Sequence, residues 1–177
     1  FFVLGYIAEK FPELINDILK KGHEIASHGY AHLDIRKAGK ENFEKDLVKS
    51  IKILKKITGK DVMGFRAPFF SIDKNSFWAV EVLSKYVAYD SSIFPVKTPL
   101  YGVPNAPRFI YKPSIKNPLQ IDQDGKLIEI PLATSRIPLL GNIPIAGGFH
   151  LRFLPYQFIK FGIKRMNRTN NLAVLYI

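Results

Sequence analysis

Apolar positions in the first half of the chain follow two patterns. Short continuous apolar runs predict buried strands, and stretches with apolar residues three and four apart predict amphipathic helices. The predicted strands are 1–5, 23–27, 61–66 and 87–89. The predicted helices are 8–21, 41–58 and 74–86. Strands that alternate with helices are typical of an α/β fold with a parallel sheet.

Each predicted helix has its own apolar face or end signal. Gly22 and Gly59 follow the first two helices as C-terminal stops, and Asp73 is placed to cap the third. The apolar face of the first helix comprises Phe11, Leu14, Ile15, Ile18 and Leu19. That of the second comprises Phe43, Leu47, Ile51, Leu54 and Ile57.

The pattern changes at 91–154. Nine of the 12 prolines lie between Pro95 and Pro144, and helical periodicity is lost. We interpret this stretch as an irregular, proline-rich insertion with one strand at 127–130. Its aromatic residues favour order and a wall facing a substrate. A helix from Pro155 to Asn167 and a strand at 172–177 complete the chain.

Length and charge narrow the possibilities. With 177 residues the chain is long enough for one domain, 1–177, and it has no cysteine for disulfides or thiolate metal sites. The net charge of +11 divides into +3 for 1–90 (15 basic, 12 acidic) and +8 for 91–177 (11 basic, 3 acidic). The basic half could contact an anionic polymer or membrane surface, or be an ordinary solvated face. No nucleic-acid motif accompanies it, so we expect no nucleic acid.

Polar residues follow three of the predicted strands. His28 comes after the second strand, Arg66 after the third and Asp90 at the end of the fourth. The active site of a parallel barrel is built from the C-terminal ends of its strands. The sequence therefore predicts one polar site at that edge.

His28 and His32 are candidate metal ligands. On one helical turn, residues four apart share a face and can meet one ion, and neutral imidazole is a common zinc ligand. They could instead be solvated loop histidines. A zinc-protease motif would need Glu after His28, where this chain has Gly29. His23 and His150 are interpreted as structural or surface residues.

Arg66 and Asp90 leave alternatives open from the residues alone. Arg66 begins the sequence Arg-Ala-Pro-Phe and could hold a catalytic carboxylate, or be an ordinary arginine before a rigid turn. Asp90 could orient Arg66, contact substrate or cap the following turn.

Taken together, these motifs resemble the polysaccharide deacetylase family, the NodB-homology domain. The resemblance is carried by Gly-His-Glu-Ile-Ala-Ser-His at 22–28 with His32, by Gly-Phe-Arg-Ala-Pro-Phe-Phe-Ser-Ile at 64–72, and by the opening 1–5. Stretches at 89–95, 147–149 and 152–156 are similar to the branch associated with exosortase and exopolysaccharide gene clusters.

The resemblance implies a deformed (β/α) barrel, incomplete in this sequence, that removes N-acetyl groups from an N-acetylhexosamine polysaccharide with a divalent metal, usually zinc. It implies that His28 and His32 bind the metal. Arg66 would position a catalytic aspartate, with Asp90 also in the catalytic set, and the backbone N–H of Phe69 would stabilise the oxyanion. Pro68 and Phe70 would contact substrate. The protein would be bacterial, either cytoplasmic or associated with the cell envelope.

Three features depart from the family pattern. An acidic pair is expected upstream of Phe1 and a histidine just after Ile177, so we interpret the sequence as an internal fragment, with little activity alone. Residue 29 is Gly where many members have Ser or Thr. The alternative is a catalytically inactive glycan-binding protein on the same barrel.

Overall fold

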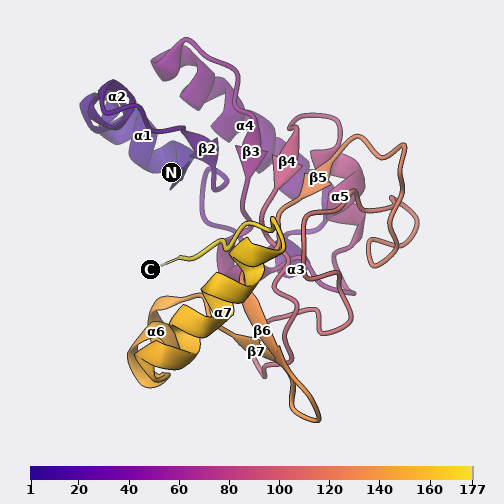
Figure 1. Cartoon of the computed structure of the whole chain (residues 1–177). Coiled ribbons are helices and arrows are strands. Elements are labelled where there is room, and N and C mark those ends of the chain that lie inside the picture. Colours follow the sequence, from indigo (N-terminus) through magenta and orange to yellow (C-terminus); the bar gives the residue numbers. More distant parts are fainter. Residues whose placement is uncertain (177) are drawn as a thin grey trace.

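The chain contains a five-stranded parallel sheet with a helical and hairpin unit beside it (Figure 1). The structure, a computed structural model, describes residues 1–176. The strands of the sheet lie in chain order: β1 (Phe2–Val3), β2 (Ala26–Ser27), β3 (Gly64–Phe65), β4 (Tyr89–Asp90) and β5 (Ile128–Glu129). All are shorter than the apolar runs that predict them, but their positions and their parallel pairing confirm the predicted α/β class.

The long helix α4 (Lys40–Thr58) agrees closely with the sequence pattern. Its apolar stripe buries Phe43, Leu47 and Leu54, each at most 2% exposed. Gly59 ends it in the left-handed conformation that a C-terminal glycine adopts without strain.

The predicted helix 8–21 is wrong in its continuity. Two helices, α1 (Gly5–Lys10) and α2 (Pro12–Lys20), replace it, with a break at Phe11. Proline has no backbone N–H, and it disfavours the helical conformation in the residue before it. Only Ile15 of the predicted apolar face is fully buried, while Phe11 and Leu14 are 46% and 49% exposed.

Helix α5 (Trp78–Leu83) is also shorter than predicted. Contrary to the prediction, Asp73 does not cap α5, because the helix begins after Phe77 with no side-chain cap; its carboxylate instead accepts the N–H of Asn75 at 2.8 Å in the turn before the helix. The sequence pattern missed two short elements, α3 (Ile35–Ala38) and the 3₁₀ turn η1 (Pro68–Phe70).

The stretch 91–154 is more regular than predicted. It contains the antiparallel hairpin β6 (Thr134–Ile137) and β7 (Gly141–Pro144), and the helix α6 (Gly148–Phe153). Helix α7 (Tyr156–Arg168) follows Pro155, as predicted. Of the expected strand 172–177, only a single parallel bridge between Val174 and Leu132 is present, and residue 177 lies outside the described residues.

Separate apolar clusters support the two halves. One surrounds Phe65 and the buried face of α4, and another packs Phe94, Leu132, Ile145 and Met166 beneath α7. Within residues 1–176, no helix combines the length and apolar character needed to cross a bilayer. The prediction of one domain with an insertion stays a prediction.

Candidate active site

The register of the sheet gathers the polar residues predicted from the sequence. Ser27 pairs with Phe65, and Phe65 pairs with Asp90, so residues 28, 66 and 90 lie at the same end of neighbouring strands. Glu129 is the register partner of Asp90 on β5 and joins this group. The sheet therefore brings together side chains that are up to 101 positions apart (129 − 28).

The two histidines lie on a loop and not on a helical turn, so that part of the sequence argument is wrong. Asp46 of α4 fastens this loop by accepting the N–H groups of Tyr30 at 2.7 Å and Ala31 at 3.0 Å. Gly29 has φ +78°, and a Cβ there would lie 2.7 Å from an oxygen of Asp46. The loop therefore favours glycine at this position.

The imidazole of His28 has a fixed tautomer. Its Nδ1 lies 2.7 Å from the carbonyl oxygen of Arg66, and a carbonyl only accepts, so Nδ1 carries the proton. Burial lowers the pKa of His28 to about 4, so the ring is neutral near pH 7. Its Nε2 is therefore a lone-pair donor, the form in which histidine binds metals.

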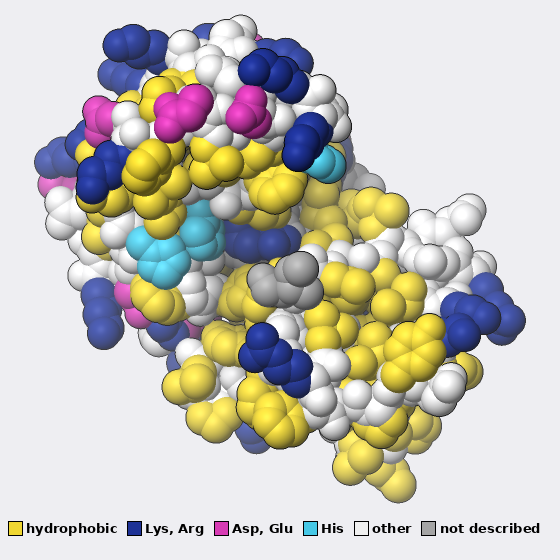
Figure 2. All heavy atoms as spheres, turned by 90° about the vertical axis from the view of Figure 1, so that its left-hand side faces the viewer, with side chains coloured by type: hydrophobic (Ala, Val, Ile, Leu, Met, Phe, Trp, Pro, Cys, Tyr) yellow, Lys and Arg dark blue, Asp and Glu magenta, His cyan; other side chains and the backbone are white. Residues whose placement is uncertain are grey.

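The ring of His32 lies next to that of His28, with centroids 5.1 Å apart. His32 has φ +56°, and its ring also contacts that of Phe69, with centroids 4.6 Å apart. Figure 2 shows two adjoining histidine side chains exposed beside a cationic side chain and an apolar rim. In a helical turn the two rings would meet because residues four apart share a face. Here the loop brings them together through the strained, left-handed backbone conformation of His32.

The histidine pair fits two positions of a metal site. A catalytic zinc takes three protein ligands and keeps one open position. Within residues 1–176, no three His, Cys, Asp or Glu side chains lie together as a possible metal site. Residues 1–176 thus offer two candidate protein ligands at this place, His28 and His32.

Arg66, whose carbonyl binds His28, has a buried side chain. Its guanidinium donates to the carbonyl oxygen of Ser91 at 2.9 Å and to the Ser91 hydroxyl at 2.7 Å, and it stacks 4.1 Å from the ring centroid of Phe2. Burial lowers the pKa of Arg66, while Asp90 and Glu129 act in the opposite direction. Arg66 is therefore the cation of a buried charged cluster.

Asp90 and Glu129 are the two acids of that cluster, with exposures of 0% and 1%. Burial raises the pKa of both, and the charge of Asp90 raises that of Glu129 further. Asp90 Oδ2 has no hydrogen-bond donor when both acids are ionised, and a proton on Glu129 would supply one. Arg66 and the two acids together carry no net charge when one proton is retained, and burial together with the charge of Asp90 favours Glu129 as the group that holds it.

Asp90 is connected to the turn that follows β3. It accepts the hydroxyl proton of Ser92, and Ser92 in turn accepts the N–H of Ala67 at 2.7 Å. The sequence suggests Asp90 as a cap of the turn after it, but the contact through Ser92 fixes the turn after β3, and the other roles stay predictions. Because Asp90 is fully buried, it acts through Ser92 on the Arg66–Phe70 segment.

The residues of that segment differ in exposure. Phe69 is 53% exposed with φ +58°, and its ring faces the histidines. Pro68 is buried, and Phe70 packs against Phe94 at 5.9 Å and Tyr176 at 4.9 Å between ring centroids. These are packing contacts, and a direct contact of Pro68 or Phe70 with substrate stays a prediction.

Sequence reasoning missed Glu129, Asp46 and the serines at 91 and 92. Glu129 had one signal, because it is the only charged residue in the apolar run 127–130. Asp46 had none, since its role depends on where a loop eighteen residues upstream of it (46 − 28) lies in space.

Comparison with known proteins decides the family. The sequence profile of the polysaccharide deacetylase family matches residues 1–87. Residues 1–87 belong to that family. A second profile, described as a domain of unknown function (DUF3473), matches residues 91–177. The more specific assignment to the exosortase-associated branch stays a prediction.

Curated relatives are deacetylases by name. A peptidoglycan-N-acetylglucosamine deacetylase of Bacillus cereus is 34% identical over 82 residues, which are 46% of this chain and 30% of the relative. A chitooligosaccharide deacetylase of Sinorhizobium fredii is 28% identical over 85 residues, 48% of this chain and 37% of the relative. The chain thus spans about a third of the length of these relatives.

Solved structures show the same fold. A polysaccharide deacetylase crystal structure from Mycobacterium smegmatis aligns with 99% of this chain and 56% of its own, with a TM-score of 0.65 at 24% identity. The PuuE allantoinase aligns with 74% of this chain and 37% of its own, with a TM-score of 0.55 at 19% identity. The predicted (β/α) barrel class is confirmed by this likeness.

Proposed function

We propose that this sequence is part of a zinc-dependent hydrolase that removes N-acetyl groups from an N-acetylhexosamine-containing polysaccharide. The names of the curated relatives support carbohydrate deacetylation. The observation that carries the metal site is the tautomer of His28, whose Nδ1–H is held by the Arg66 carbonyl while Nε2 stays available beside His32. This arrangement orients a histidine ligand in many metal sites.

The described residues divide the work of amide hydrolysis. A bound divalent ion would polarise the acetamide carbonyl and lower the pKa of a water molecule. His28 and His32 would hold that ion. Phe69, whose ring contacts His32, would offer its backbone N–H to the oxygen that becomes negative in the transition state. Arg66 would place its buried charge next to this N–H group. It would also orient the catalytic aspartate, which the family resemblance places upstream of Phe1.

Asp90 and Ser92 would position the same segment. The chain of contacts from Asp90 through Ser92 to the Ala67 N–H fixes the backbone that leads to Phe69. A shift of about 1 Å in a catalytic donor costs roughly 100-fold in rate. We therefore place Asp90 among the positioning residues of the reaction.

Zinc titration tests the metal site. His28→Ala and His32→Ala are each expected to abolish stoichiometric zinc binding in the full-length protein, and with it acetate release from a chitooligosaccharide. His23→Ala is the matched control, since His23 is an exposed histidine that contacts Phe1 and not the site. If His28→Ala retained full zinc stoichiometry, the ligand assignment would be wrong.

A glycan-binding protein without turnover is the second candidate. It is favoured by the presence of only two candidate ligands at the site within residues 1–176. For the same reason we expect the 177-residue chain alone to release little acetate. Glycan binding by the full-length, zinc-loaded protein without any acetate release would favour this alternative.

A further inference from the structure

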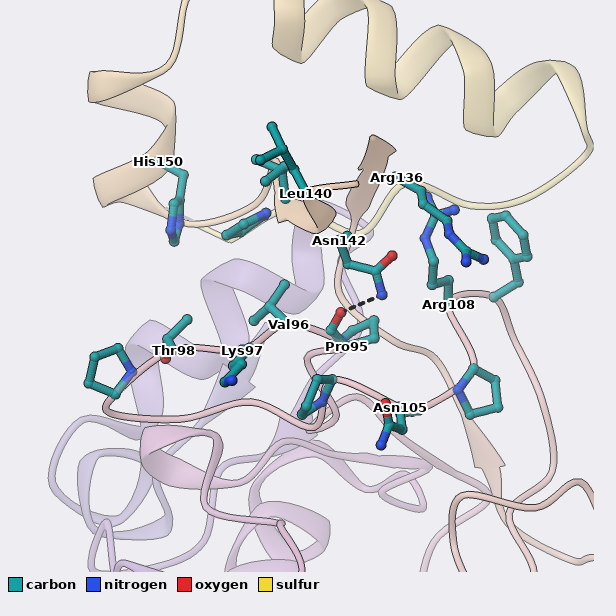
Figure 3. Close-up of a pocket in the computed structure, with 18 of the residues that line it drawn as sticks. Pro95, Val96, Lys97, Thr98, Asn105, Arg108, Arg136, Leu140, Asn142 and His150 are labelled. Carbon is teal, nitrogen blue, oxygen red and sulfur yellow. Dashed lines mark hydrogen bonds between the residues drawn. The ribbon is translucent and has the colours of Figure 1, made fainter. Parts of the chain in front are cut away.

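A second site lies in the half of the chain whose family has no assigned function. A cavity of about 1070 Å³ opens between the loop 95–109, the β6–β7 hairpin and the start of α6 (Figure 3). All its lining residues lie between Pro95 and His150, so it is distinct from the histidine site. An amide N–H of Asn142 donates to the Pro95 carbonyl at 2.8 Å and ties the hairpin to the loop.

The lining of this cavity is cationic. Lys97, Arg108 and Arg136 line it together with His150, and no Asp or Glu does. All ion pairs recorded among residues 1–176 join residues between Asp17 and Lys85. The cations of the cavity are therefore without a carboxylate partner in the described part of the chain.

Arg108 is held in place with most of its donors unused. Its guanidinium donates to the Thr134 hydroxyl at 2.9 Å and to the Thr134 carbonyl at 2.6 Å, and it is half-buried. Burial and the positive charges of Arg165 and Arg136 lower the pKa of Arg108. Neighbouring guanidiniums repel each other, and an anion between them would convert that repulsion into attraction.

The remaining lining suits a sugar chain. Proline rings, Leu140 and Phe149, which is 65% exposed, supply apolar surface, and Asn105, Asn142 and Thr98 supply polar groups. Figure 3 shows Arg108 and Arg136 side by side at one end of the cavity and His150 at the other. The volume of about 1070 Å³ slightly exceeds the range of about 300–1,000 Å³ that is usual for small-molecule sites, which favours an oligosaccharide over one sugar.

The cavity is linked to the histidine site by packed aromatic rings. His150 contacts Phe94 with centroids 6.4 Å apart, and Phe94 contacts Phe70 at 5.9 Å. Phe70 follows Phe69, whose ring lies on His32. The two places are thus joined through one set of packed rings.

We propose that this cavity binds a carboxylate-bearing stretch of the polysaccharide, so that the substrate is an acidic polymer containing uronic acid as well as N-acetylated sugars. Guanidinium groups recognise carboxylates through paired hydrogen bonds. The proposal rests on the proposed function for the identity of the polymer. It assigns the second half of the chain to recognition of the acidic sugar.

Calorimetric titration with two oligosaccharides of equal length tests the proposal. We expect an oligogalacturonate to bind at least tenfold more tightly than a neutral chitooligosaccharide, with or without zinc. Arg136→Gln should weaken uronate binding at least tenfold, and Arg108→Gln should do the same. Lys164→Gln removes an equal charge from the exposed face of α7, outside the cavity, and should leave binding unchanged.

Three outcomes would overturn the proposal. The first is equal binding of the two oligosaccharides. The second is an equal loss from Lys164→Gln, which would indicate general charge attraction. The third is tighter binding of a DNA oligomer with the same dependence on Arg136, which would assign the site to nucleic acid. Arg136 is exposed, so its variant stays informative if Arg108→Gln fails to fold. Uronate binding retained in His28→Ala would show that the cavity acts independently of the deacetylation site.

Discussion

Gly29 is the residue on which the histidine loop depends most directly. The Cβ of any other residue there would meet Asp46, and the backbone of that residue would have to adopt φ +78°. Asp46 would then lose its bonds to the two loop N–H groups that place His32. The absence of a Cβ at Gly29 thus allows the backbone conformation that places His32 in the proposed metal site.

Gly29→Ser is therefore expected to lower the free energy of unfolding by roughly 1–3 kcal/mol and to weaken zinc binding. Gly22→Ser is the matched control, because Gly22 has φ +82° but nothing within 4 Å of its Cβ position. Urea unfolding and zinc titration would measure both. Equal losses of unfolding free energy and zinc affinity in the two variants would mean that the contact with Asp46 contributes to neither.

Glu129 gives the protein a pH-dependent stability. The pKa of Glu129 is raised in the folded state by burial and by Asp90, whereas in the unfolded chain it returns to about 4.3. Above that pH the folded state binds more protons than the unfolded state, so stability falls as the pH rises. Asp90, with its pKa raised to about 6, adds to this fall between about pH 4 and pH 6.

Glu129→Gln should remove the contribution of Glu129. Gln mimics the protonated acid, since it can accept the Ile93 N–H, which Glu129 binds at 2.9 Å, and donate to Asp90. We expect unchanged stability near pH 4 and a gain of about 1 kcal/mol or more near pH 8, since one unit of pKa corresponds to about 1.4 kcal/mol. Melting temperatures across this pH range, with the exposed Asp124→Asn as control, would measure it. An unchanged pH profile would mean that Glu129 is ionised in the folded protein.

At the scale of elements, the periodicity of α4 predicted the packing and that of α1 and α2 did not. Both stretches have apolar residues three and four apart. α4 is continuous and lies against the sheet and its neighbouring helices, whereas Pro12 breaks the first stretch and turns part of its apolar face outward. Leu54 is 0% exposed and Leu14 is 49% exposed.

These two leucines form a matched pair for mutation. Leu54→Ala should cost about 2–5 kcal/mol of unfolding free energy, because it leaves a cavity in the core. Leu14→Ala should change stability by less than about 0.5 kcal/mol. Chemical denaturation of both variants would test the break at Phe11, and a large loss from Leu14→Ala would instead support the single continuous helix.

At the scale of the whole molecule, the two halves differ in electrostatics. Residues 1–90 carry nearly balanced charges and all the ion pairs of the described residues, while 91–177 carry an excess of +8. The balanced half holds the histidine pair, and three of the eleven basic residues of the other half, Lys97, Arg108 and Arg136, line the cavity. This division favours one polymer substrate contacted in two ways, at an N-acetyl group by the first half and at its carboxylates by the second.

The sequence by itself determined the α/β class, the helix α4 with its glycine stop, and the choice of His28, His32 and Arg66 as candidate site residues. Those features depend on local periodicity, end signals and short motifs, which are properties of neighbouring residues. The tertiary structure alone decided that Glu129 meets Asp90, that Asp46 requires Gly29, and that Lys97, Arg108 and Arg136 line one cavity. These pairings join positions 17 to 39 residues apart (46 − 29, 129 − 90, 136 − 97), and only the register of the sheet and the packing of loops bring them into contact.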